Sequence, residues 1–152
     1  MVDFKIKGTG VESQTPLQQP GSRGAGGTAA SGASFADSVK TARRELLDGD
    51  LRELLDKTRA LGERFFRSPD ESKLNAYKSG IREFLEKVRG EMFNLKEEKG
   101  GFQEGRQKIF QLVEVVQTDV DALTRETLQK DKALTLLASL DEIRGLVINV
   151  AI

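Results

Sequence analysis

Residues 74–92 read LNAYKSGIREFLEKVRGEM and carry the most regular hydrophobic pattern of the chain. Its apolar side chains recur at intervals of three and four residues, while charged side chains fill the positions between them. That spacing places one apolar stripe along one face of an α-helix. The stripe comprises Leu74, Tyr77, Ile81, Phe84, Leu85, Val88 and Met92. A helix with one apolar face needs neighbours, so the stretch predicts a helical bundle.

The rest of the chain supplies those neighbours. Helical spacing also appears in 35–47, in 51–65, in the stretch from Ile109 to Leu123, and from Asp131 onward. The last of these carries the widest apolar stripe, which comprises Leu134, Leu137, Leu140, Ile143, Val147 and Val150. The prediction is therefore an all-α, antiparallel bundle of about four helices.

The N-terminal region has a different composition. Residues 8–34 read GTGVESQTPLQQPGSRGAGGTAASGAS and offer few groups that can be buried. Such composition is typical of disordered segments, because little apolar area is available to offset the entropy of ordering. We therefore expect a disordered tail over 1–34 and a helical domain over 35–152.

Three places are predicted to interrupt the helices. Asp48-Gly49-Asp50 predicts a break or kink, with Asp50 able to cap the following helix. Ser68-Pro69-Asp70-Glu71 fits a capping box in which Ser68 is the N-cap and Pro69 the first helical residue. Glycines 100, 101 and 105 interrupt the pattern near 93–112, where a short β-hairpin or a loop is an alternative to helix.

Composition excludes much chemistry. The chain has no histidine and no cysteine, which removes thiolate nucleophiles, disulfides, the usual zinc ligands and the common proton shuttle. The 24 basic and 24 acidic residues cancel, so no global field draws the chain to nucleic acid or anionic lipid. Paired acids such as Asp119 and Asp121 fit solvated helix faces better than a metal site. We expect no catalytic residues, no metal and no cofactor.

Three motifs carry a resemblance to a known family. They are Leu61-Gly62-Glu63-Arg64, then Tyr77-Lys78 followed by Phe84-Leu85, and the closing run DEIRGLVIN over 141–149. With them, the stretch from Leu54 to Ile152 resembles the YaaR family of small bacterial proteins. The resemblance implies an all-helical protein of the bacterial cytoplasm and supplies no catalytic residues. It does not extend to the N-terminal tail.

Candidate binding residues come from two places. Around 93–110, Arg106 and Lys108 lie near aromatic residues, an arrangement typical of single-stranded nucleic-acid binders, although glutamates dilute the charge. Phe102 is flanked by glycine and glutamine and has no helical stripe to join, so it either covers the core or contacts a partner. Arg144 lies beside Gly145 and either binds a partner's acid or pairs with an acid of its own bundle.

These observations favour a non-enzymatic helical interaction module in the cytoplasm. Its expected partner is a protein or a second copy of the chain, and membrane binding is not expected. Nucleic-acid binding through the 93–110 element is the alternative, and a small-ligand sensor is a more remote one. Gly145, inside the last helix, predicts that a neighbouring element approaches its backbone closely.

Overall fold

The computed structural model describes the backbone of residues 24–99 and 104–151 and the side chains of residues 34–95 and 104–151. Its described part contains four α-helices: α3 (Gly24–Arg67), α4 (Glu71–Lys99), α5 (Glu104–Asp121) and α6 (Lys130–Val150). Residues from Arg43 onward form one compact unit, and the part of α3 before Arg43 does not belong to it. The all-α class and the count of about four helices are confirmed.

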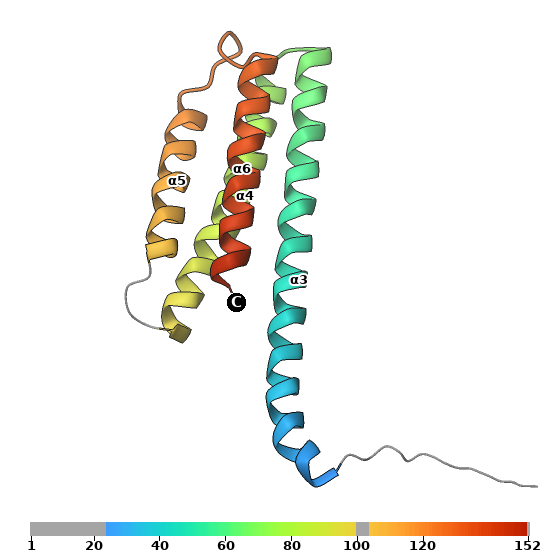
Figure 1. The fold of residues 1–152 in the computed structure, drawn as a ribbon. Coiled ribbons are helices and arrows are strands. Elements are labelled where there is room, and N and C mark those ends of the chain that lie inside the picture. The colour runs from blue at the N-terminus through green and yellow to red at the C-terminus, as the bar shows by residue number, and fades with distance from the viewer. Residues whose placement is uncertain (1–23, 100–103, 152) are drawn as a thin grey trace, which may run out of the picture. The chain divides into compact units, whose positions relative to one another are not determined.

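Within residues 43–152 the helices run up, down, up and down (Figure 1). Ion pairs show the antiparallel register directly. Lys57 of α3 pairs with Glu83 of α4 at 2.8 Å, and Asp50 of α3 pairs with Lys87 of α4 at 3.7 Å. The earlier residue of α3 therefore pairs with the later residue of α4, which means that the two helices run in opposite directions. Lys132 of α6 meets Asp119 of α5 at 3.4 Å. The predicted antiparallel arrangement is confirmed.

The α4 stripe lies at the centre of this unit. Every one of its seven predicted members is buried, and Ile81, Phe84, Leu85 and Val88 are fully so. The predicted α5 stripe is also buried, from Ile109 to Val120, together with Leu123 in the loop that follows. The hydrophobic spacing of these two segments therefore identified the core correctly.

The α3 helix runs through the predicted break. Asp48, Gly49 and Asp50 are all helical, so the expected break and the role of Asp50 as a cap are wrong. The physical reason is burial: Leu47 and Leu51, on either side, are both in the core and hold the helix against its neighbours. Helix propensity differs by only about 1 kcal/mol between glycine and alanine, and packing overrides it.

The capping box is also corrected. The Asp70 carboxylate accepts a hydrogen bond from the Lys73 backbone amide at 2.7 Å, so Asp70 is the N-cap of α4 and Ser68 is not. Pro69 therefore precedes the helix instead of opening it. The hairpin alternative near 93–112 is wrong in its flanks, because 93–95 belong to α4 and 109–112 to α5.

The N-terminal part of α3 differs from the prediction in two ways. The helix begins at Gly24, inside the stretch assigned to the tail, while residues 1–23 lie outside the described residues. The apolar side chains expected to form a packed stripe over 35–47 are mostly exposed. Phe35 is 71% exposed and Leu46 is 69% exposed, and only Leu47 joins the core.

Candidate functional site

A groove of about 460 Å³ lies on the unit formed by residues 43–152. Its walls come from α3 and α6, and Tyr77 of α4 also borders it. Volumes of this order are typical of sites that bind small ligands or anchoring side chains. The residues around it are Thr58, Arg59, Gly62, Glu63, Phe66, Arg67, Tyr77, Lys130, Ala133, Leu134 and Leu137.

Helical spacing explains why these residues meet. On α3, Thr58, Gly62 and Phe66 are spaced four residues apart and therefore share one face. On α6, Lys130, Leu134 and Leu137 are spaced three or four residues apart, so they share the face of α6 that lines the groove. Thr58 is buried without penalty, because its hydroxyl donates to the Leu54 carbonyl at 2.8 Å.

The interior end of the groove depends on a glycine. A Cβ atom at Gly62 would lie 3.1 Å from Cε1 of Tyr77, so the glycine leaves space for the tyrosine ring against α3. The ring is 2% exposed, and burial raises the pKa of Tyr77 to about 12. Among the described residues, none makes a hydrogen bond with the Tyr77 hydroxyl, and its oxygen is not sealed from solvent.

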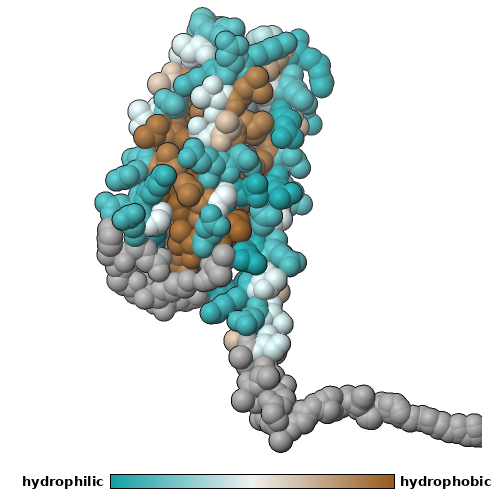
Figure 2. All heavy atoms as spheres, viewed as in Figure 1, coloured by the Kyte–Doolittle hydropathy of each residue, from teal (hydrophilic) through white to brown (hydrophobic). Residues whose placement is uncertain are grey.

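Leu134 is the most exposed apolar side chain in the groove. It is 67% exposed, although the wide apolar stripe of the last helix predicted that it faces the core. The core-facing residue is instead Leu136, which is 1% exposed and lies with Leu140, Ile143 and Val147 on the inner face of α6. Figure 2 shows hydrophobic patches along α6, interrupted by hydrophilic side chains.

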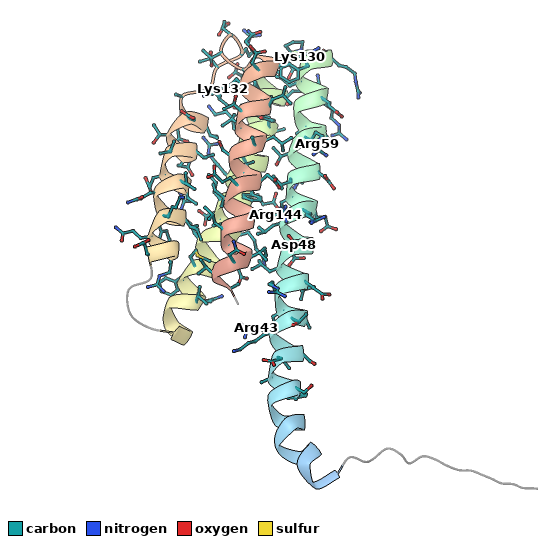
Figure 3. The ribbon with its side chains drawn as sticks, in the orientation of Figure 1. Arg43, Asp48, Arg59, Lys130, Lys132 and Arg144 are labelled. Atoms are coloured by element: carbon teal, nitrogen blue, oxygen red, sulfur yellow. The ribbon has the colours of Figure 1, made fainter. Side chains whose placement is uncertain are left out.

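Positive charge predominates around the groove. Arg59 is engaged by Asp56 at 3.0 Å, whereas neither Arg67 nor Lys130 forms an ion pair within the part of the chain that the structure describes. Glu63 is the one acid among the groove residues. Figure 3 shows Lys130 at the first turn of α6 and Arg59 on α3. Two uncompensated cations therefore stand beside an apolar surface.

The residues proposed from sequence are placed elsewhere. Phe102 lies outside the described residues. Arg106 is buried at 6% exposure on the inner face of α5, whereas Lys108, two positions along, is exposed. The two basic side chains therefore do not form one surface.

Arg144 pairs within its own bundle. Its guanidinium donates to Asp48 of α3 and, at 3.0 Å, to Asp141 of α6, and Asp48 also pairs with Arg52 at 3.0 Å (Figure 3). Burial disfavours the charged guanidinium, but the hydrogen bonds that it donates to Asp141 and Asp48 outweigh this effect, and the pKa of Arg144 is raised. This is the intramolecular pairing that the sequence left open as one of two interpretations.

Other glycines and acids are accounted for by packing and pairing. A Cβ atom at Gly145 would meet nothing within 4 Å, so the predicted close approach there is wrong. Close approach occurs instead at Gly80, where a Cβ would lie 2.9 Å from Cδ1 of Leu61, and at Gly105, 2.9 Å from Cγ2 of Val150. Asp119 and Asp121 pair with Lys132 and Arg82.

Among the described residues, no three acidic side chains come together in a way that could hold a metal ion. No described helix combines the length and the apolar character needed to cross a membrane.

Sequence reasoning missed the groove because no motif marks it. Leu134 looks like an ordinary member of the stripe predicted for the last helix, and Phe66 lies just beyond the stretch 51–65; only the register of α3 against α6 leaves Phe66 partly buried and Leu134 67% exposed. Gly62 was the one available signal, since a glycine within a helix costs stability unless the space beside it is used.

The fold and the groove together define a class: a four-helix antiparallel bundle with an apolar surface groove between its first and last helices. The chain belongs to the family described as "Protein of unknown function (DUF327)", whose model matches residues 9–151. It is similar to the crystal structure of protein TM1646 from Thermotoga maritima, of the same family. That similarity has 29% identity and a TM-score of 0.45, covering 76% of this chain and 96% of that one. No curated protein matches the chain.

Proposed function

We propose that this protein is a non-enzymatic interaction module and that a protein partner docks in the groove between α3 and α6. The observation that carries the proposal is the exposed Leu134 side chain, which lies in the groove beside the apolar side chains of Phe66 and Leu137. Partly enclosed apolar surfaces of this kind are typical of sites that a partner covers. The absence of histidine and cysteine supports a role without catalysis.

The nucleic-acid alternative has less support. It relied on Arg106 and Lys108 acting together, and the buried position of Arg106 leaves Lys108 as the accessible member of that pair. Phosphate binding depends on several accessible cations, because affinity grows with the number of phosphates neutralised. Protein binding is therefore the better-supported reading.

Two narrower statements belong to the same proposal. The motifs at 61–64, 77–85 and 141–149 support membership of the YaaR group within the family. The lack of cysteine supports a place in the reducing bacterial cytoplasm.

A cross-linking experiment tests the docking site. A photoactivatable amino acid replaces Leu134 in one variant and Val115, which is 60% exposed on α5, in the matched control. We expect one protein to be captured in bacterial cells through position 134 and not through position 115. The captured protein is then purified and titrated against the wild type, Leu134→Glu and Val115→Glu by calorimetry.

Leu134→Glu should weaken binding by about tenfold or more, which corresponds to about 1.4 kcal/mol, while Val115→Glu should bind as the wild type does. Both side chains are exposed, so neither variant should unfold the bundle. Equal affinity for all three proteins would contradict the proposed site. A cross-linked product that nuclease digests, unlike a protein–protein cross-link, would favour the nucleic-acid alternative.

A further inference from the structure

We infer that the partner segment is an acidic amphipathic helix, which lays its apolar face between α3 and α6 and directs carboxylates toward Arg67 and Lys130. This inference rests on the proposed function and specifies the partner for the same groove. Three independent features of the groove support it: its shape, its charge and its unused hydrogen-bonding group.

The shape fits a helix. Both walls are antiparallel helices whose groove-facing residues recur every three or four positions, from Thr58 to Phe66 on one wall and from Lys130 to Leu137 on the other. A helical partner presents its own apolar side chains at the same spacing, so its side chains fit between those of α3 and those of α6. Leu134, already 67% exposed, is the side chain that such a helix would cover.

The charge selects an acidic partner. Arg67 and Lys130 make no ion pair among the described residues, and Glu63, the one acid that lines the groove, pairs with neither of them. Arg67 lies in the last turn of α3 and Lys130 in the first turn of α6. The last turn of α3 and the first turn of α6 lie at the same end of the bundle (Figure 1), so both cations are at that end. A carboxylate on the partner would complement this end, and a lysine there would be repelled.

The Tyr77 hydroxyl adds a polar requirement. It borders the groove, its ring is almost completely buried, and no described residue accepts its proton. Its oxygen is open to solvent at the edge of the groove, so the hydroxyl can donate to water or to an acceptor on a bound partner. A polar or acidic side chain on the docked helix would take the place of that water.

The test uses the full chain and a yeast-displayed library of single helices with randomised surface positions. Helices are selected on the wild-type protein and depleted on Leu134→Glu, so that only groove binders remain. We expect the enriched sequences to carry large apolar residues three or four apart and an excess of Asp and Glu over Lys and Arg.

Single variants then separate the contributions. Arg67→Glu and Lys130→Glu should each weaken the selected helices by about tenfold, and Tyr77→Phe by about threefold. Lys108→Glu is the matched control, because it reverses an exposed charge on α5 outside the groove, and it should change nothing. Circular dichroism of each variant confirms that the fold is retained.

The outcomes distinguish this inference from the proposal beneath it. Enriched helices that are neutral or basic, or charge reversals without effect, would overturn the acidic helix while leaving a docking groove. If no helix is enriched and a fatty acid such as decanoate binds instead, the groove is a small-ligand site and the inference is wrong. If nothing is enriched and the Leu134 cross-linker also captures nothing, the proposed function itself fails.

Discussion

Tyr77 combines a buried ring with a hydroxyl that no described residue engages. Burial raises its pKa to about 12 because the phenolate would lose solvation. An unfolded chain ionises its tyrosine near pH 10. Between these two values the unfolded state loses a proton that the folded state keeps, so the contribution of Tyr77 to stability declines as pH rises through this window.

This difference can be measured directly, because the chain contains one tyrosine and no tryptophan. In native buffer, the phenolate absorption band should appear about two pH units later than in concentrated denaturant, following the pKa near 12. Circular dichroism at each pH shows whether the fold persists. A native titration that coincides with the denatured one would mean that the ring is not enclosed between α3 and α4.

Single residues also show where sequence reasoning stops. The buried α4 residues could be predicted, since hydrophobic spacing reports directly which face needs covering. The roles of Arg144 and Leu134 could not, because both depend on the register of α6 against α3. Arg144 meets Asp48 across 96 positions of sequence. No local pattern encodes such a pairing.

At the level of helices, Asp70 fixes where α4 begins. Its carboxylate accepts from the Lys73 amide at 2.7 Å and pairs with the Lys73 ammonium at 2.8 Å. The side-chain hydrogen bond from Lys73, followed by that from its backbone amide, lowers the pKa of Asp70. A lowered pKa means that the cap stabilises the fold above the ordinary Asp pKa of about 3.9 and is lost as pH falls through the lowered value.

Asp70→Ala should therefore lower the melting temperature at neutral pH, and the difference from wild type should shrink below about pH 4. Ser68→Ala is the matched control. It removes the residue that the capping-box pattern favoured but that the structure does not use, so it should melt as the wild type does. If Ser68→Ala were the more destabilising variant, the start of α4 would be misassigned.

The uninterrupted α3 teaches a related lesson about helices. Asp48-Gly49-Asp50 has the residue types of a turn, and the prediction of a break depended on these residue types alone. In the structure Leu47 and Leu51 are both buried. A break between them would remove at least one of these side chains from the core. Local propensity amounts to about 1 kcal/mol, whereas two buried leucines contribute several.

For the whole molecule, residues 43–152 contain the core. The first buried side chain of α3 is Leu47, and all described side chains from 34 to 42 are exposed. We therefore expect a chain shortened to begin at Arg43 to fold, with a melting temperature within about 4 °C of the full chain. Circular dichroism during heating measures it. A fall of about 10 °C or more would show that residues before Arg43 stabilise the bundle.

The class and antiparallel order of the fold could thus be predicted from sequence, because each follows from the spacing of apolar residues and the shortness of the connections. The groove could not, since it is a property of two helices together. Leu134 belongs to a stripe that looks complete in the sequence, and its exposure follows only from how α6 is placed against α3.

The solvent-exposed ion pairs that join neighbouring helices have a consequence for experiments in salt. Lys57–Glu83, Arg82–Asp121 and Lys132–Asp119 all have side chains that are at least one-third exposed, so dissolved ions screen them and each contributes little. The bundle is held by apolar burial, which salt does not weaken. Raising the ionic strength should therefore leave melting almost unchanged while it releases an acidic partner from Arg67 and Lys130, so salt separates association from folding without any mutation.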